Sequence, residues 1–306
     1  MRDTSAPAPD QNRPVQGVLW MLGTTLCFTA VNVIVHHLGT DLPAAQSSFL
    51  RFAWGLVFVA PALWQGLSTR YGARVWALFG LRGALQSVAV LLWFFAMART
   101  PIADVTAIGY LNPIVVTLGG ALLLGEGFAW RRGLAVVAAL IGALIILRPG
   151  LREVLPGHIA QLGAAIFFGL SYITAKKLSG AASASVVVAM MTAVVTLCLA
   201  PFAMAVWRPL GWGEFLWLGA AAVFGTVAHY AMTRAFQCAP VAVTQPVVFT
   251  QLVFAATAGW LLFGEQVDPF VILGGALIIG AISYVTWREA QIKRRGVTPP
   301  EPATRT

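Results

Sequence analysis

The chain has 306 residues, of which 58% are hydrophobic and only 10% are charged, and its formal net charge is +9. Soluble domains carry about 25% charged residues, so this composition excludes an ordinary soluble protein and indicates a membrane protein. The positive charge does not indicate nucleic-acid binding, because the lysine and arginine residues lie mainly in predicted loops and tails. Membrane proteins carry the charges that fix their orientation in these segments.

Apolar segments of about 20 residues, long enough to cross the hydrocarbon core as helices, recur along the chain. After a predicted disordered tail over residues 1–14, the first half contains five of them, over Val15–Leu38, Pro43–Gln65, Val75–Ala98, Pro101–Leu124 and Trp130–Leu147. The second half contains five more before a basic tail over residues 288–306, namely His158–Leu178, Ser183–Trp207, Gly213–Gln237, Pro240–Phe263 and Pro269–Trp287. We therefore predict an all-α membrane protein with ten transmembrane helices, divided into domains 15–147 and 158–287.

The segment Pro101–Glu126 returns in altered form at Pro240–Glu265. At an offset of 139 residues, seven of the 26 aligned positions are identical, including the first proline and the final Gly-Glu pair. The chain is therefore predicted to contain a duplicated unit. Because each unit has five helices, the second must enter the membrane from the opposite side, which predicts two inverted repeats around a central cavity.

Charge placement gives the predicted orientation. With both termini in the cytoplasm, the inside segments hold 14 lysine and arginine residues and the outside segments hold four, while Arg51 and Arg82 lie within helices. The positive-inside rule therefore predicts that both termini, including the two tails, are cytoplasmic.

Two five-helix units, each with a Pro-x-Ala start and a Gly-Glu end on its fourth helix, resemble the EamA-type members of the drug/metabolite transporter superfamily. The stretch His229–Glu265 is the most characteristic part. The resemblance implies a multi-pass carrier of the bacterial inner membrane that works by alternating access. It implies a small organic substrate, such as an amino-acid-like, nucleoside-like or vitamin-like solute, but does not identify the solute, the direction of transport or the coupling ion.

Polar side chains within the predicted helices are the candidates for a substrate site, because ionisable groups in the hydrocarbon core face the bundle interior or water. Arg82 and Gln86 share one face of the third helix, where both can present hydrogen-bond donors to a carboxylate. The alternatives for Arg82 are a contact with lipid phosphate or with carbonyl groups of a neighbouring helix.

A second group of candidates lies on helices related by the repeat. Tyr110 and Asn112 are near the middle of the fourth helix, and Phe249 and Gln251 are their equivalents at the 139-residue offset. Tyr172 lies deep in the sixth helix. We expect these residues to line the cavity between the halves, where transporter sites lie. For a single asparagine or glutamine, the alternative is an interhelical hydrogen bond.

Three ionisable residues within the predicted helices have other candidate roles. Arg51 and Asp104 enter the membrane from the same side at depths that differ by about 7 Å, so an ion pair between them is one interpretation. The alternative places each group at a wet interface. His229 is a candidate for proton coupling, although a membrane histidine also serves as a hydrogen-bonded packing residue.

Other residues are predicted to have structural roles. His36 lies at the outer end of the first helix and is expected at the membrane interface. Glu126 and Glu265 are predicted to cap the start of the helix that follows each of them. Gly274 and Gly275 are expected to allow close helix packing.

The sequence contains no P-loop, no H-E-x-x-H and no G-x-S-x-G motif, and its three cysteines lack metal-ligand spacing. We therefore predict a secondary transporter that is not an enzyme and has no cofactor and no metal site. Its predicted partners are a small-molecule substrate and the lipid bilayer, without nucleic acid, and it is expected as a monomer or weak homodimer. The alternatives are a non-transporting receptor or scaffold and a membrane-embedded enzyme.

Overall fold

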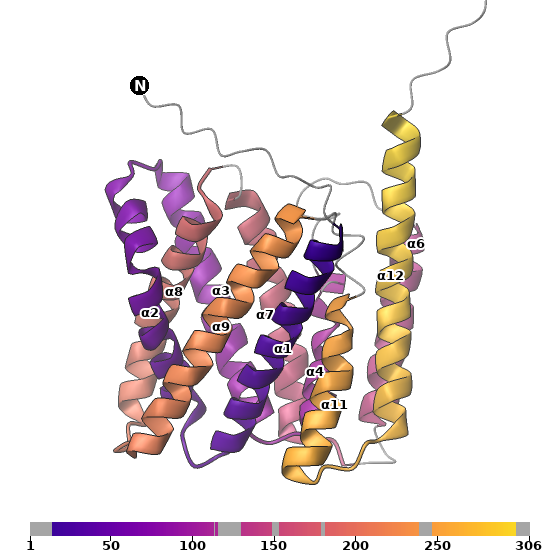
Figure 1. Ribbon diagram of the computed structural model, residues 1–306, viewed down its shortest axis with the longest axis horizontal. Coiled ribbons are helices and arrows are strands. Elements are labelled where there is room, and N and C mark those ends of the chain that lie inside the picture. Colours follow the sequence, from indigo (N-terminus) through magenta and orange to yellow (C-terminus); the bar gives the residue numbers. More distant parts are fainter. Residues whose placement is uncertain are drawn as a thin grey trace, which may run out of the picture.

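The computed structural model describes residues 14–112, 114–115, 130–148, 153–178, 181–238 and 247–297. Over these ranges the protein is a bundle of helices without a strand (Figure 1). The first half contributes α1 (Pro14–Leu38), α2 (Ala44–Ser68), α3 (Ala73–Met97), α4 (Ile102–Gly109) and α6 (Trp130–Leu147). The second half contributes α7 (Pro156–Leu178), α8 (Ala184–Ala205), α9 (Trp212–Cys238), α11 (Thr250–Phe263) and α12 (Pro269–Val297).

Six of the described helices, three in each half, are long and apolar enough to cross a membrane. They are α1, α2, α3, α7, α8 and α9, and shorter apolar segments lie within α6, α11 and α12. Parts of the predicted fourth and ninth helices lie outside the described residues. The all-helical membrane class is thus confirmed, whereas the count of ten crossings remains a prediction.

The two halves pack against each other helix by helix. The most extensive contacts are those of α3 with α7, α1 with α9, α2 with α8 and α6 with α12, and α4 also contacts α11. This set of pairs is unchanged when the halves are exchanged, as a duplicated unit requires. In Figure 1, α2 and α8 lie at one edge of the bundle and α6 and α12 at the other.

Equivalent helices run in opposite directions, because the end of one contacts the start of the other. Arg148, which follows α6, forms an ion pair with Asp268, which precedes α12. The backbone N–H of Ile102, the first residue of α4, donates to the carboxylate of Glu265, which follows α11. Both contacts lie at the same end of the bundle, which we call the Glu265 end.

The fourth helix of each repeat is interrupted at an equivalent position. Helix α4 ends in a turn at Tyr110 and Leu111, and a turn at Phe249 precedes α11. Phe249 is the residue equivalent to Tyr110 in the second repeat. The helix-breaking residues Pro113 and Pro246 lie outside the described residues, as does Glu126.

The last helix is longer than the sequence predicted. Helix α12 continues to Val297 instead of ending at Trp287. Lysine and arginine form helices readily and are favoured in the last turns, where they interact well with the helix dipole. The change from apolar to basic residues therefore marks the end of the apolar segment and not the end of the helix.

Glycines allow α6 and α12 to approach until their backbones are in contact, as predicted for Gly274. A Cβ atom added at Gly274 would lie 2.5 Å from the carbonyl oxygen of Gly142, and one added at Gly142 would lie 2.8 Å from that of Gly274. Both distances are shorter than van der Waals contact, and neither neighbour is a flexible side chain that can turn away. The crossing therefore requires glycine on both helices.

Gly274→Ala is expected to destabilise the protein by about 1–3 kcal/mol, because the added methyl group must separate two packed helices. The measurement is the melting temperature of the detergent-purified protein. Gly280→Ala on the same helix is the control, since a Cβ atom there meets nothing within 4 Å. Equal melting temperatures for the two variants would contradict the backbone contact.

Candidate functional site

Arg82 is buried on α3, where the first half meets the second. Its Nη1 donates to the carbonyl oxygen of Val187 on α8 at 3.1 Å. Its buried Nε has no acceptor among the described residues. The structure thus realises one of the predicted alternatives, a carbonyl contact with a neighbouring helix, and leaves donor capacity on the guanidinium group.

Gln86 lies one turn from Arg82 and is also buried. The hydroxyl group of Ser171 on α7 donates to Gln86 Oε1 at 2.9 Å. The same hydroxyl group lies 3.4 Å from the carbonyl oxygen of Arg82. Because Oε1 is the acceptor, the amide NH2 of Gln86 keeps its donors for another partner. Sequence reasoning missed Ser171, because serine is common in membrane helices and nothing in its spacing relates it to Gln86.

Tyr172 follows Ser171 and links α7 to the break after α4. Its side chain lies beside that of Asn112 and within electrostatic range of Arg82. Its ring stacks on Phe168 with centroids 6.4 Å apart. Tyr172 nevertheless exposes 41% of its surface, and the buried Oδ1 of Asn112 has no donor among the described residues. A side chain with these contacts and this exposure borders open space.

The aromatic residues at the two helix breaks meet. The rings of Tyr110 and Phe249 are 5.4 Å apart and nearly perpendicular, and the Tyr110 hydroxyl group donates to the carbonyl oxygen of Val248 at 3.4 Å. Tyr110 and Phe249 are equivalent residues of the two repeats. Their contact therefore lies at the pseudo-symmetry axis that relates the two halves. Gln251 is half-buried on the first turn of α11, two residues from Phe249.

Four of the predicted substrate-site residues, together with Ser171, therefore form one connected group across both halves. We call it the central cluster; it consists of Arg82, Gln86, Asn112, Ser171 and Tyr172. Tyr110 and Phe249 form a second contact beside it, and Gln251 lies next to that contact. That all these residues border one cavity remains a prediction.

The structure replaces the suggested Arg51–Asp104 ion pair with separate contacts. The Arg51 guanidinium packs against α9, where a Cβ atom added at Gly225 would lie 2.5 Å from Nη2, and it lies 4.7 Å from the centroid of the Phe52 ring. Asp104 instead pairs with His158. Depth in the membrane alone could not reveal this, because α2 packs against α8 and α9 whereas α4 packs against α7 and α11.

His229 on α9 lies within electrostatic range of Arg51 and Arg82. Its ring packs edge-on against Phe28 of α1, with centroids 5.2 Å apart. The histidine is thus part of a cationic region in the bundle interior, and its role in proton coupling remains a prediction.

Asp104 and His158 form a buried pair that sequence reasoning missed. The His158 Nε2 lies 2.9 Å from Asp104 Oδ2, and the two side chains are 0% and 3% exposed. The backbone N–H of Leu155 donates to His158 Nδ1 at 3.0 Å. Nδ1 is therefore an acceptor, so the proton of a neutral imidazole lies on Nε2 and is donated to Asp104.

Glu265 and His36 form a second pair between the halves, with 3.1 Å between His36 Nε2 and Glu265 Oε1. The carboxylate also accepts the N–H of Ile102 at 3.1 Å. The prediction that Glu265 caps the helix that follows it is therefore wrong. Glu265 caps α4 of the other repeat, whereas Asp268 caps the helix after Glu265 by accepting the N–H of Phe270 at 2.9 Å. His36 is half-buried against Glu265 and not simply interfacial.

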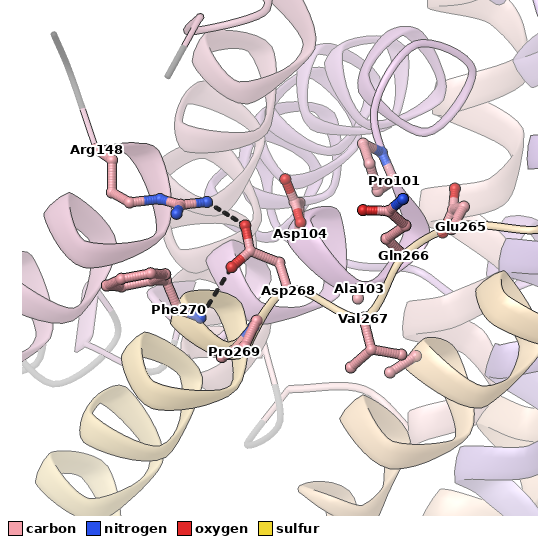
Figure 2. A pocket seen from close by; sticks show the side chains of 11 residues that line it. Pro101, Ala103, Asp104, Arg148, Glu265, Gln266, Val267, Asp268, Pro269 and Phe270 are labelled. Atoms are coloured by element: carbon pink, nitrogen blue, oxygen red, sulfur yellow. Dashed lines mark hydrogen bonds and ion pairs between the residues drawn. The ribbon is translucent and has the colours of Figure 1, made fainter. Parts of the chain in front are cut away.

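A pocket of about 500 Å³ lies at the Glu265 end (Figure 2). Its lining includes Asp104, Glu265, Asp268 and Arg148. Figure 2 shows Arg148 bonded to Asp268 at one side of the pocket, with Glu265 at the other and Asp104 between them. One residue of each histidine pair thus lines the pocket, although the Asp104 side chain is only 3% exposed.

The profile of the EamA-like transporter family matches residues 15–148 and 155–287, so one copy covers each half. This chain belongs to that family. Membership confirms the resemblance inferred from the two repeats. It also places the protein among membrane transporters and not among enzymes.

Named relatives match over nearly the whole chain. A riboflavin transporter of Vibrio cholerae is 30% identical over 293 residues, covering 93% of this chain and 97% of the relative. A pseudopaline exporter of Pseudomonas aeruginosa is 28% identical, covering 87% of this chain and 94% of the relative. An S-adenosylmethionine uptake transporter of Rickettsia prowazekii is 24% identical, covering 90% and 94%. A crystal structure with 18% identity aligns with a TM-score of 0.59 over 90% of this chain and 99% of its own, which shows the shared fold.

Proposed function

We propose that this EamA-family protein is a secondary transporter that moves a small organic metabolite across a bacterial inner membrane by alternating access. In this proposal the ten helices form two inverted repeats around a central cavity, and the central cluster contacts the substrate. Both termini are cytoplasmic, as are residues 1–14 and the basic residues 288–306, which include the end of α12, and the protein works as a monomer or weak homodimer.

The observation that carries the proposal is the central cluster itself. Its residues come from both halves, so rocking of one half against the other would separate Arg82 and Gln86 from Tyr172 and Ser171. A substrate bound there would contact both halves and sense their relative position. A packed scaffold has no need for buried polar atoms without partners, such as Arg82 Nε and Asn112 Oδ1.

The chemistry of the cluster supports an amphipathic substrate. Arg82 and Gln86 offer donors suited to a carboxylate or another acceptor-rich group, and Asn112 Oδ1 offers an acceptor. The rings of Tyr172, Tyr110 and Phe249 offer surfaces for an aromatic or apolar portion. Relatives named for riboflavin, S-adenosylmethionine and pseudopaline support a metabolite in this size range.

The test combines binding and flux. The detergent-purified protein is screened by thermal shift against metabolites that include riboflavin, S-adenosylmethionine, amino acids and nucleosides, because a ligand that binds the folded state raises the melting temperature. At a ligand concentration of 100 times Kd, the expected stabilisation is about 2.7 kcal/mol. Each hit is then tested for uptake into proteoliposomes loaded with the same unlabelled solute.

Solute exchange across the proteoliposome membrane is the expected result, since a carrier exchanges bound solute without an external energy source. A ligand that stabilises the protein but never crosses the membrane, with or without an ion gradient, would contradict transport and support a receptor. Empty liposomes and the Arg82→Ala variant serve as the negative controls.

A further inference from the structure

The hydrogen bonds of His36 require a proton beyond those of a neutral histidine and a carboxylate. His36 Nδ1 lies 2.7 Å from the carbonyl oxygen of Met97, and a carbonyl oxygen only accepts, so Nδ1 carries a hydrogen. Nε2 lies 3.1 Å from Glu265 Oε1. That contact is a hydrogen bond only if a proton lies on Nε2 or on the carboxyl group. The pair in this structure therefore holds one titratable proton.

The second histidine pair shows the opposite arrangement. His158 Nδ1 accepts the backbone N–H of Leu155, so a neutral imidazole satisfies the contacts with both Leu155 and Asp104. A second proton on that ring would have to displace the Leu155 bond. Uptake of a proton therefore adds a bond to the His36–Glu265 pair, whereas at His158 it would break the Leu155 bond.

The proton on this pair joins the two halves. His36 belongs to the first half, and Glu265 belongs to the second and also holds the start of α4 in the first half. Without the proton, the lone pair of Nε2 faces a carboxylate oxygen, so an attractive contact becomes a repulsive one. The Phe263 ring, edge-on to the imidazole with centroids 4.5 Å apart, limits the rotation by which His36 could avoid Glu265.

Water has a route to the pair. Glu265 lines the pocket of about 500 Å³ at this end of the bundle, and other lining residues, such as Gln266 and Val267, are exposed. The side chains of His36 and Glu265 are themselves 17% and 16% exposed. A proton can therefore reach or leave the pair while the halves are in contact.

We propose that His36 and Glu265 form a proton-binding site that controls the opening of the Glu265 end. With the proton bound, the two halves are joined at this end, and the positive-inside orientation makes it the outer end. Loss of the proton to the pocket releases the halves and opens the transporter outward. The inference rests on the proposed transport function and names the proton as the ion that regulates access.

The ionisable groups on the surrounding elements have contacts of their own in this state. Asp104 of α4 pairs with His158 of α7, and Asp268 at the start of α12 pairs with Arg148. At the start of α9, Glu214 pairs with Arg208. Arg99, after α3, stacks on Phe95, and the ring of His37 packs on Trp217 of α9. None of these contacts includes His36 or Glu265.

The test measures the distance across the gate without any substrate. Spin labels are attached to a cysteine-free background (Cys27→Ala, Cys198→Ala, Cys238→Ala) carrying Thr40→Cys and Gln266→Cys, one exposed position on each half. Double electron–electron resonance in lipid nanodiscs then gives the label distances between pH 5 and pH 9. We expect one short distance at low pH and a second, longer population that grows as the pH rises.

Variants identify the group responsible. Glu265→Gln keeps the contact with Ile102 and donates its amide N–H to Nε2 of neutral His36, so only the short distance is expected at every pH. His36→Leu removes the bond, so the longer population is expected at every pH. Asp104→Asn is the control, because an amide oxygen still accepts from His158, and it should retain the pH dependence of the parent protein.

A pH-dependent distance that persists in Glu265→Gln would overturn the proposal, as would a parent protein whose distances do not change with pH. Because no solute is present, neither result bears on whether the protein transports one. Conversely, a failure to find transport would leave a measured pH-dependent gate unaffected. The two proposals are therefore tested separately.

Discussion

Arg82→Ala is expected to weaken binding of the transported solute by about ten- to a hundredfold. A hydrogen bond to a charged group contributes about 1.5–3 kcal/mol, and each 1.4 kcal/mol corresponds to a factor of ten in Kd. The alanine side chain also removes the contact with Val187. The measurement is the concentration dependence of the ligand-induced thermal shift, using a hit from the metabolite screen.

A second variant separates the effect of the positive charge of Arg82 from the effect of its donor geometry, and a third is a control. Arg82→Lys keeps the charge but loses the planar fork of donors, so an intermediate affinity is expected. Arg99→Ala is the matched control, because Arg99 is exposed and donates to the carbonyl oxygen of Phe95 near the end of α3. An Arg82→Ala variant that binds the solute as tightly as the parent protein would place the substrate elsewhere.

His158→Ala is expected to cause the largest loss of stability, about 3–5 kcal/mol. The substitution removes the N–H that the buried Asp104 carboxylate accepts, and taking a partner away from a buried charge has a cost of this size. The change also deprives the Leu155 N–H of its acceptor at the start of α7. The measurement is the melting temperature in detergent, compared with the parent protein at the same pH.

Asp104→Asn tests the assigned geometry of this pair. The amide oxygen still accepts the His158 N–H without a buried charge, so the melting temperature should change much less than in His158→Ala. If Asp104→Asn destabilised the protein as much as His158→Ala does, the neutral imidazole donor inferred from the Leu155 contact would be wrong. The two variants together therefore distinguish loss of a donor from loss of a charge.

Local properties of the chain made the fold class predictable. Apolar segments of about 20 residues can be recognised directly in the sequence, because a helix that crosses the hydrocarbon core must be predominantly apolar. The duplicated segment containing Gly264-Glu265 could be recognised for a similar reason, since both copies end in the same Gly-Glu pair. Helix ends were harder to predict, as the extension of α12 to Val297 shows, because basic residues end an apolar segment but not a helix.

Four of the five residues of the central cluster were predicted from the sequence. Arg82 and Gln86 lie four residues apart on one helix, so they share a helical face however the helices pack. The repeat offset related Tyr110 to Phe249, and the structure shows these two rings in contact. The involvement of Ser171 and the contact of Tyr172 with Asn112 did not follow, because they depend on how α7 faces α3 and α4.

The sequence by itself determined that this protein is a duplicated helical membrane protein of a transporter family, because hydrophobicity and repetition are encoded residue by residue. Only the tertiary structure decided the partners of the buried ionisable groups. Asp104 meets His158 and not Arg51, and Glu265 meets His36. In each case the partner comes from the other half of the chain, and helix-to-helix packing, which no local pattern records, selects it.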